Sequence, residues 1–419
     1  MRDVVILGST GSIGTQALEL VVERRDQFRV VALAAGGSNI ELLAQQVLDH
    51  QPAVVALTRA QAVQDLQLAL YAQASRRGWS AGEMTLPRIL AGPDAANQAA
   101  GLDCDVVLNA ITGSAGLVPT LTTLAAGTTL ALANKESLVV GGRLVTEAAA
   151  EGQIVAVDSE HSAIAQCLRA GRAEEVDRLI LTASGGPFRG RTRAELVAVT
   201  PEQAMQHPTW NMGRVITTNS ATLINKGLEL LEAHLLYDVP LERIDVVVHP
   251  QSVIHSMVQY VDGSTLAQCS PPDMRLPIAL GLTWPDRVPG AAQPCDWSAA
   301  TSWTFEPLDN DAFPAVDLAR RAGALGGTAP AVLNAANEEC VDAFGAGRID
   351  FVTITDTIAA VLDEHVASAS SASNVGVADV PSDRLGATHV SSDRMDLDTV
   401  LAADRWARER ARALTSPVS

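Results

Sequence analysis

The sequence predicts an α/β protein built from a helix-covered parallel sheet, a mixed α/β domain and a small C-terminal helical domain. Three observations lead to this prediction. Short apolar, β-branched runs alternate with helical patterns over residues 1–150, which is typical of parallel strands buried on both faces. Longer, loop-rich stretches separate the strands over residues 151–290. Only helical patterns follow over residues 313–419.

The first part holds five predicted strands and five predicted helices in alternation. The strands are apolar runs at Val4–Leu7, Val30–Ala34, Ala53–Leu57, Val106–Asn109 and Thr129–Ala133. The helices have apolar residues at helical spacing and lie at Gly14–Glu23, Ile40–Leu48, Ala60–Ala74, Leu117–Ala125 and Glu136–Ala150.

The second part opens with strands predicted at Ile154–Val157, Leu179–Leu181 and Ile244–Val248. Val253–Tyr260 and Ser264–Gln268 flank Asp262-Gly263 and predict a β-hairpin with a tight turn. A stretch rich in Pro and Trp, residues 291–312, is predicted to be a linker.

The last part is predicted to be helical, with one interruption. Its helices are expected at Phe313–Ala322, Pro330–Phe344, Ile354–His365 and Leu397–Leu414. The Ser-, Ala- and Gly-rich stretch over residues 366–393 is predicted to be a loop within this domain.

Charge and composition exclude several classes of partner. A chain of 419 residues with a net charge of −18 and no basic patch repels nucleic acid. Five scattered cysteines without a CxxC pair favour reduced thiols in a cytoplasmic protein. The uncharged stretch between Asp105 and Lys135 is broken by Gly, Pro and Asn, so no membrane span is expected.

A glycine-rich loop follows the first predicted strand and opens the first helix. Gly8, Gly11 and Gly14 recur every third position, which permits a tight turn and a close approach of the backbone to a pyrophosphate. The amino end of the helix then favours the negative phosphates. The alternative is a glycine-rich turn without a ligand, but the place of the loop in an alternating domain favours a Rossmann-like dinucleotide-binding domain.

The end of the second strand bears on which dinucleotide is bound. An NAD site usually carries an acidic residue there, which binds the ribose 2′-hydroxyl. The segment Ala35-Gly36-Gly37-Ser38-Asn39 has no acidic residue, so a 2′-phosphate is tolerated and NADPH is favoured. The same segment has no Arg or Lys, so the residues alone support this preference only in part.

Two carboxylates follow the strand at Ile154–Val157. If this segment is extended, Asp158 and Glu160 point the same way and can converge on one ion. Two carboxylates without a nearby thiol suit a hard cation such as Mg²⁺ or Mn²⁺. The alternative is a solvated acidic pair or a helix N-cap region.

A third carboxylate and several polar groups come from a predicted helix over residues 219–229. Asn225, Lys226 and Glu229 are spaced to share one face, although a surface Lys–Glu pair has the same spacing. Ser220 is expected at the helix amino end, where it offers an anion site. The loop Ser184-Gly185-Gly186 offers a second anion site, with a plain turn as its alternative.

Together these segments resemble the 1-deoxy-D-xylulose 5-phosphate reductoisomerase family. The resemblance runs in family order from residue 8 to residue 338 and rests on GSTGSIG, LANKES, VDSEHSAI, SGGPFR, HPTWNMG, SATLINKGLE, HPQSVIHSMV, PPDMRLPIA and LNAANE. It implies a homodimer that rearranges a sugar phosphate into a branched aldehyde. NADPH then reduces the aldehyde to 2-C-methyl-D-erythritol 4-phosphate, with a divalent metal ion (Mg²⁺, Mn²⁺ or Co²⁺).

The resemblance also implies roles for individual residues. Asp158, Glu160 and Glu229 ligate the metal, and Lys135 and Glu160 are catalytic. Substrate is bound by Lys135, Ser159, Glu160, Ser184, His207, Trp210, Ser220, Asn225, Lys226 and Glu229. NADPH is bound by Thr10, Gly11, Ser12, Ile13, Gly36, Gly37, Ser38, Asn134, Glu136 and Gly213. The segment 207–213 is expected to form a lid in which Trp210 covers the substrate.

The sequence departs from the family at the second strand. Gly37 stands where the family often has Lys, which leaves the contacts to the 2′-phosphate open. Two alternative functions remain: another two-domain NADP-dependent dehydrogenase, and a non-catalytic module that senses dinucleotides. Neither of them needs the three carboxylates.

Overall fold

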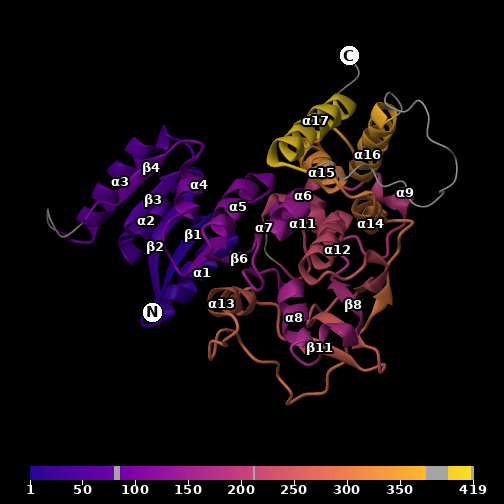
Figure 1. The fold of residues 1–419 in the computed structure, drawn as a ribbon, viewed down its shortest axis with the longest axis horizontal. Helices are drawn as coiled ribbons and strands as arrows, with labels where there is room; N and C mark the ends of the chain where they lie inside the picture. Colours follow the sequence, from indigo (N-terminus) through magenta and orange to yellow (C-terminus); the bar gives the residue numbers. More distant parts are fainter. Residues whose placement is uncertain (80–84, 211–212, 374–394, 417–419) are drawn as a thin grey trace.

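The computed structural model of the chain describes residues 1–79, 85–210, 213–373 and 395–416. Figure 1 shows the N-terminal sheet on one side of the molecule and the later helices on the other. Within the described residues, the first sheet has seven parallel strands in the order β4-β3-β2-β1-β5-β6-β7. The strands are β1 (Arg2–Leu7), β2 (Phe28–Ala35), β3 (Val54–Leu57), β4 (Arg88–Ala91), β5 (Val106–Asn109), β6 (Thr129–Leu132) and β7 (Ile154–Ala156).

Helices cover both faces of this sheet because successive strand residues point to opposite sides. Val4 and Ile6 of β1 join one buried cluster, whereas Val5 and Leu7 join another. The helices that follow these strands are α1 (Ser12–Glu23), α2 (Ile40–His50), α3 (Ala62–Arg76), α4 (Ala95–Ala100) and α5 (Leu117–Ala125), preceded by the short η1 (Ser114–Gly116). One later helix, α13 (Arg275–Thr283), returns to this domain and buries Ile278 in the first cluster.

The second sheet is mixed, as the sequence predicts. Over the described chain it has five strands in the order β11-β10-β8-β9-β12. They are β8 (Val176–Ala183), β9 (Ile244–Val248), β10 (Ile254–Tyr260), β11 (Thr265–Cys269) and β12 (Glu306–Pro307). Strands β8 and β9 are parallel, whereas β10 and β11 form the predicted antiparallel hairpin.

Short helices connect the two sheets and carry much of the later site. They are α6 (Lys135–Gly141), α7 (Arg143–Ala148), α8 (Ser159–Leu168), α9 (Arg193–Leu196), α10 (Pro201–Ala204), α11 (Arg214–Thr222) and α12 (Ile224–Tyr237), with the 3₁₀ turns η2 (Ala173–Glu175) and η3 (Leu241–Arg243).

The C-terminal helices share one apolar core with the second sheet. They are α14 (Ala315–Leu325), α15 (Ala329–Gly345), α16 (Phe351–Ser373) and α17 (Leu397–Thr415). One continuous buried cluster contains Leu181 of β8, Leu228 of α12 and Phe344 of α15. Phe351 packs edge-on against both Phe188 and Phe344, with ring centroids 5.1 and 5.7 Å apart. The helical region and the second sheet therefore stabilise each other.

The predicted fold class is confirmed, but several elements differ. The strand predicted to open the second part is β7, which pairs with β6 and extends the first sheet. Gly142, with φ at +48°, divides the helix predicted at Glu136–Ala150 into α6 and α7. The edge strand β4 and the helix α4 were not predicted from sequence. The division at residues 150, 290 and 312 stays a prediction.

Two predicted loop regions also contain regular structure. The predicted linker contributes β12, which pairs with β9. In the Ser-rich stretch, α16 continues to Ser373, so the first eight residues of the predicted loop are helical. The rest of that stretch up to residue 393 lies outside the described residues.

Two further observations concern the chain as a whole. No helix in the described ranges is long and apolar enough to cross a membrane. All five cysteines are free thiols, and burial raises the pKa of Cys340 to about 12.

Candidate active site

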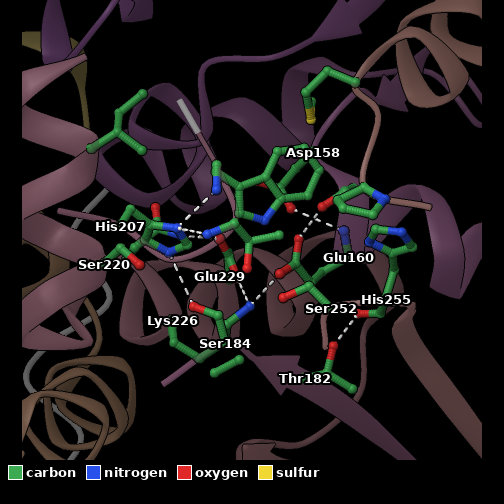
Figure 2. Close-up of a pocket in the computed structure, with 18 of the residues that line it drawn as sticks. Asp158, Glu160, Thr182, Ser184, His207, Ser220, Lys226, Glu229, Ser252 and His255 are labelled. Atoms are coloured by element: carbon green, nitrogen blue, oxygen red, sulfur yellow. Dashed lines mark hydrogen bonds and ion pairs between the residues drawn. The ribbon is translucent and has the colours of Figure 1, made fainter. Parts of the chain in front are cut away.

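A cavity of about 510 Å³ lies where several strands of both sheets end. Part of its wall comes from residues beyond the carboxyl ends of β1, β6, β7 and β8, which meet there. Figure 2 shows the carboxylates and polar side chains gathered around this pocket. Of the predicted site residues, it brings together Ser12, Ile13, Lys135, Asp158, Ser159, Glu160, Ser184, His207, Trp210, Gly213, Ser220, Asn225, Lys226 and Glu229.

Three carboxylates form the centre of the cavity. Oxygen atoms of Asp158, Glu160 and Glu229 lie within 4.8 Å of one another, and the Glu229 side chain is buried. Asp158 is the N-cap of α8, and its Oδ1 accepts a hydrogen bond from the Glu160 amide at 3.2 Å. Glu229 comes from α12, far along the chain. Three converging oxygen ligands without a thiol suit a hard divalent cation.

The way Asp158 and Glu160 converge differs from the prediction. The sequence argument placed both on an extended strand, but the strand ends at Ala156 and Ser159 begins a helix. An N-cap side chain folds back over the first turn of its helix. Asp158 therefore meets Glu160 across the helix start rather than along a strand.

Both lysines of the chain lie between these carboxylates. Lys135 and Lys226 are the only two lysines in the sequence, and both are buried. Lys135 Nζ donates to Asp158 Oδ2 and Glu229 Oε1, each at 2.6 Å. Lys226 Nζ donates to Glu160 Oε1 at 2.6 Å and pairs closely with Glu229. The two ammonium groups neutralise much of the buried negative charge.

The site shifts the pKa values of its own groups. Burial would lower the pKa of Lys135, but the Asp158 and Glu229 carboxylates raise it well above its ordinary value. Burial, and then the Glu229 charge, raise the pKa of Glu160 to about 7. Burial would raise the pKa of Asp158, yet Lys135 and His161 hold it well below its ordinary value. The two predicted metal-binding carboxylates on α8 thus differ sharply in acidity.

His161 links the carboxylates to the helix that follows. Its Nδ1 lies 3.3 Å from Asp158 Oδ1 and 3.2 Å from Glu232 Oε2, and its Nε2 lies 2.9 Å from the Glu229 carbonyl oxygen. Burial would lower the pKa of His161, but Glu232 and Asp158 raise it to about 9. A ring protonated on both nitrogens can donate to Asp158 Oδ1 and to the Glu229 carbonyl, which orients Asp158.

A second group of polar residues forms the other end of the cavity. Ser184 Oγ lies 3.1 Å from His207 Nε2 and accepts a hydrogen bond from the Gly186 amide at 3.2 Å. Gly185 and Gly186 have φ values of +85° and +67°, which glycine adopts readily. Ser184, Ser220 and Lys226 therefore offer donors to an anion at this end.

The prediction that Ser220 begins a helix is wrong. Ser220 lies in the last turn of α11, and Leu223, with φ at +62°, separates α11 from α12. The break turns the chain so that Asn225, Lys226 and Glu229 of α12 face the same cavity as Ser220. A single uninterrupted helix was the wrong interpretation of this segment.

The segment predicted as a lid lies at the mouth of the cavity. His207 Nδ1 accepts from the amides of Thr209 and Trp210 at 3.1 and 2.9 Å. The Trp210 ring lies 6.3 Å from the ring of His255. Asn211 and Met212 are outside the described residues.

The glycine loop reaches the cavity through its helix. A Cβ atom on Gly14 would lie 2.4 Å from the Gly8 carbonyl oxygen, so only glycine permits this approach of α1 to the loop. Ser12 and Ile13, at the start of α1, line the cavity. The other predicted cofactor residues lie outside its lining, namely Thr10, Gly11, Gly36, Gly37, Ser38, Asn134 and Glu136.

Asn134 and Glu136 flank Lys135 at the start of α6. Asn134 caps that helix by accepting from the Ser137 amide at 2.8 Å, and its amide donates to the Gly113 carbonyl at 2.9 Å. Glu136 lines a smaller cavity of about 130 Å³ beside Gly113.

Sequence reasoning missed several residues that line the main cavity. They are Thr182, Ser252, His255, Asp273 and Met274, among others. His255 and Ser252 belong to the quoted segment HPQSVIHSMV, and Asp273 and Met274 belong to PPDMRLPIA. The signal was therefore present, but no local chemistry distinguished these residues from ordinary strand and loop residues.

The fold and the cavity define a class of protein: an oxidoreductase that places a dinucleotide loop beside a carboxylate metal site. The chain belongs to the 1-deoxy-D-xylulose 5-phosphate reductoisomerase family. A family model described as 1-deoxy-D-xylulose 5-phosphate reductoisomerase matches residues 4–142. Two models of the family's C-terminal domains match residues 154–237 and 269–410.

Relatives cover nearly the whole chain. The 1-deoxy-D-xylulose 5-phosphate reductoisomerase of Cutibacterium acnes is 66% identical over 411 residues, which cover 98% of this chain and 98% of that protein. The enzyme of the same name from Paenarthrobacter aurescens is 59% identical over 98% of this chain and 97% of that protein.

Solved structures agree over the same length. The Zymomonas mobilis reductoisomerase in complex with NADPH superposes with a TM-score of 0.82 at 40% identity, over 100% of both chains. A reductoisomerase in complex with NADPH, fosmidomycin and magnesium gives a TM-score of 0.85 at 34% identity, over 99% of this chain and 98% of that one.

Proposed function

We propose that this chain uses NADPH and a divalent cation to convert 1-deoxy-D-xylulose 5-phosphate into 2-C-methyl-D-erythritol 4-phosphate. One observation carries the proposal: three carboxylates and both lysines of the chain converge in the cavity that the glycine-loop helix α1 enters. Relatives of the same name support it over the full length of the chain.

The carboxylates fit a divalent cation. Asp158, Glu160 and Glu229 offer three carboxylate oxygens within 4.8 Å of one another and no thiol, which is the donor set that a hard cation prefers. We assign the metal to these three side chains and keep Mg²⁺, Mn²⁺ and Co²⁺ as candidates. When bound, the cation supplies Lewis-acid stabilisation of negative charge on substrate oxygens.

The protein's own residues then bind and orient the substrate. Ser184, His207, Ser220, Asn225 and Lys226 are proposed to hold the phosphate end, which supplies binding energy remote from the reacting carbons. Lys135 and Ser159 are proposed to orient the reacting end. Glu160 is also the candidate that holds or releases a proton. Trp210 is proposed to cover the substrate and exclude water.

The cofactor is proposed to lie along the carboxyl edge of the first sheet. Thr10, Gly11, Ser12 and Ile13 would hold its phosphates at the start of α1. The adenosine end would reach Gly36, Gly37 and Ser38, while Asn134, Glu136 and Gly213 would contact the nicotinamide half. NADPH supplies the hydride that reduces the rearranged aldehyde.

Two alternative functions predict different behaviour. Another two-domain NADP-dependent dehydrogenase would keep its activity when divalent cations are removed. A dinucleotide-sensing module would bind NADPH without turning over a sugar phosphate. Neither accounts for the burial of Lys135 and Lys226 among three carboxylates.

A direct assay separates these possibilities. NADPH absorbance is followed with 1-deoxy-D-xylulose 5-phosphate, first with Mg²⁺ and then after treatment with EDTA. We expect metal-dependent oxidation of NADPH that EDTA abolishes and that added Mg²⁺ or Mn²⁺ restores. Oxidation that persists at the same rate in EDTA would contradict the proposed metal site.

We also propose that the protein acts as a homodimer in the cytoplasm. The family resemblance supports the dimer, and the five free cysteines are compatible with a reducing compartment. Light scattering coupled to size-exclusion chromatography tests the dimer directly, and elution at the mass of one 43.9 kDa chain would contradict it.

A further inference from the structure

We infer that Arg59, which lies outside every quoted family segment, supplies the positive charge that selects NADPH over NADH. The inference rests on the proposed function and deepens it, because it names the residue that distinguishes the two coenzymes. They differ only in the 2′-phosphate of the adenosine ribose. In folds of this type that ribose lies beyond the end of the second strand, beside the glycine loop.

The end of β2 forms a surface that has no acidic residue to repel a 2′-phosphate. The segment after β2 reads Gly36-Gly37-Ser38-Asn39, and Asn39 is used as the N-cap of α2, where it accepts from the Leu42 amide at 3.2 Å. A Cβ atom on Gly36 would meet no atom within 4 Å, so space is open above it. The amides of Gly8 and Ser9 both donate to the Ala34 carbonyl at 2.9 Å and fix the glycine loop beside this surface.

Arg59 reaches the same surface from the neighbouring strand. It follows β3, whose end is tied to β2 by the hydrogen bond from the Thr58 amide to the Ala35 carbonyl at 3.1 Å. Its Nε donates to the Gly36 carbonyl at 3.1 Å. Parallel strands end at the same edge of a sheet, so a residue after β3 lies beside the residues after β2.

The guanidinium group retains donors for a ligand. Within the described residues, no carboxylate lies within ion-pair distance of Arg59, and its two terminal NH₂ groups have no hydrogen-bond acceptor. Twelve other arginines of the described chain pair with Asp or Glu, as Arg29 and Arg77 do. A planar guanidinium binds phosphate oxygens through two parallel hydrogen bonds.

The position of Arg59 also explains how the chain can do without a basic residue at position 37. The family often has Lys there, but Gly37 has φ at +89°, and a Cβ atom on it would lie 3.1 Å from Ala62 Cβ and 3.6 Å from Arg59 Nε. A longer side chain at position 37 would compete with Arg59 for this space. In this chain the positive charge therefore comes from Arg59, after the end of β3, next to the position where a lysine would stand.

The test compares Arg59→Gln with wild type in binding and in turnover. Quenching of protein fluorescence measures the Kd for NADPH and for NADH without substrate or metal. We expect the Kd for NADPH to rise roughly 10- to 100-fold, as for loss of a charge-assisted hydrogen bond, with the Kd for NADH within about twofold. Arg59→Lys should recover part of the preference because it keeps the charge.

A matched control removes the same charge elsewhere on the sheet. Arg88 is exposed and opens β4, so it lies at the opposite end of the parallel strands from Arg59. Arg88→Gln should leave both Kd values unchanged. Increasing salt should reduce the NADPH preference of wild type but not that of Arg59→Gln.

Each outcome decides between the possibilities. An unchanged Kd for NADPH in Arg59→Gln, or an equal rise for both coenzymes, would overturn the inference and leave Arg59 as a support for the Gly36 carbonyl. Wild-type protein that binds NADPH selectively through Arg59 but does not turn over the sugar phosphate would uphold the inference and contradict the proposed function.

Discussion

At the scale of single residues, two lysines and three carboxylates converge at the centre of the main cavity. The chain has only two lysines, and both are buried in the cavity. All of its other Lys and Arg residues are arginines. An ammonium group is a compact charge with three rotatable donors, and each lysine here pairs with one carboxylate at the start of α8 and with Glu229 of α12. Lys135 and Lys226 thus hold Asp158, Glu160 and Glu229 close together despite their like charges.

Glu229→Gln tests the metal ligand that sequence reasoning drew from a separate helix. The amide keeps the shape of the side chain but removes a negative charge from the predicted ligand set. We expect kcat to fall by about 100-fold or more at low Mg²⁺, with an unchanged Kd for NADPH. Glu242→Gln, an exposed residue of η3, is the control. Near-normal turnover of Glu229→Gln at low metal would remove Glu229 from the site.

Lys226→Ala tests the phosphate end of the cavity. Loss of an ammonium group that binds phosphate should raise the KM for the sugar phosphate roughly 10- to 100-fold. The contacts of Lys226 with Glu160 and Glu229 predict a fall in kcat as well, since these carboxylates lose their neutralising partner. Initial rates at saturating NADPH and metal measure both effects. A KM equal to that of wild type would exclude Lys226 from phosphate binding.

At the scale of elements, helix starts and helix breaks position the site. Asp158 caps α8, Asn134 caps α6, and the residues of the glycine loop lead directly into α1. Leu223 breaks what would otherwise be one long helix and turns α12 toward the carboxylates. Each of these features needs only a few residues, yet each aims a functional side chain at the same cavity.

Gly14→Ala tests the contact between α1 and its loop. The added methyl group would lie 2.4 Å from the Gly8 carbonyl oxygen and 2.6 Å from Ser9 Cα, so α1 must shift. We expect about 1–3 kcal/mol loss of stability and a rise of the NADPH Kd of at least about tenfold. Val22→Ala, on the exposed side of α1, should change neither. Unaltered NADPH binding in Gly14→Ala would contradict the proposed role of the loop.

At the scale of the whole molecule, the C-terminal helices and the second sheet share one buried core, so we expect them to unfold together. Their side chains belong to one buried cluster, whereas the first sheet has separate clusters on its two faces. A fourth cluster joins Leu130 and Leu132 of β6 to Ala331 of α15 and Val400 of α17. The strand β7 and the helix α13 connect the first sheet with the rest of the chain. Strand β7 pairs in the first sheet, and the helix α8 that follows it carries Glu160. Helix α13 comes late in the chain but packs against the first sheet. Relative movement of these two parts would therefore act directly on the carboxylates.

Phe344→Ala tests this shared core. Truncation of a fully buried phenylalanine costs about 3–5 kcal/mol, and the loss should destabilise β8 as much as α15. Hydrogen exchange followed by mass spectrometry should show loss of protection in both elements together. Leu325→Ala, at an exposed position, is the control. Protection of β8 that stays at the wild-type level while α15 exchanges freely would show that the helical region is a separate unit.

The sequence by itself determined the fold class, the glycine loop and most strands and helices, and the family resemblance added fourteen of the residues that line the main cavity. These features follow from local patterns: apolar periodicity, glycine spacing and polar residues at strand ends. Local patterns failed where packing decides the conformation. The break at Leu223 and the pairing of β7 with the first sheet depend on contacts with other elements, whereas the N-cap position of Asp158 is the alternative that the residue pattern left open.

Only the tertiary structure decided which charges meet. The segment after β2 contains no basic residue, and Arg59 reaches it from a neighbouring strand. The burial of both lysines among Asp158, Glu160 and Glu229 likewise joins residues that are 23, 66 and 94 positions apart in the sequence. Residue spacing predicts neighbours within a helical turn or a hairpin, whereas contacts between separate elements arise only when the sheets and helices pack.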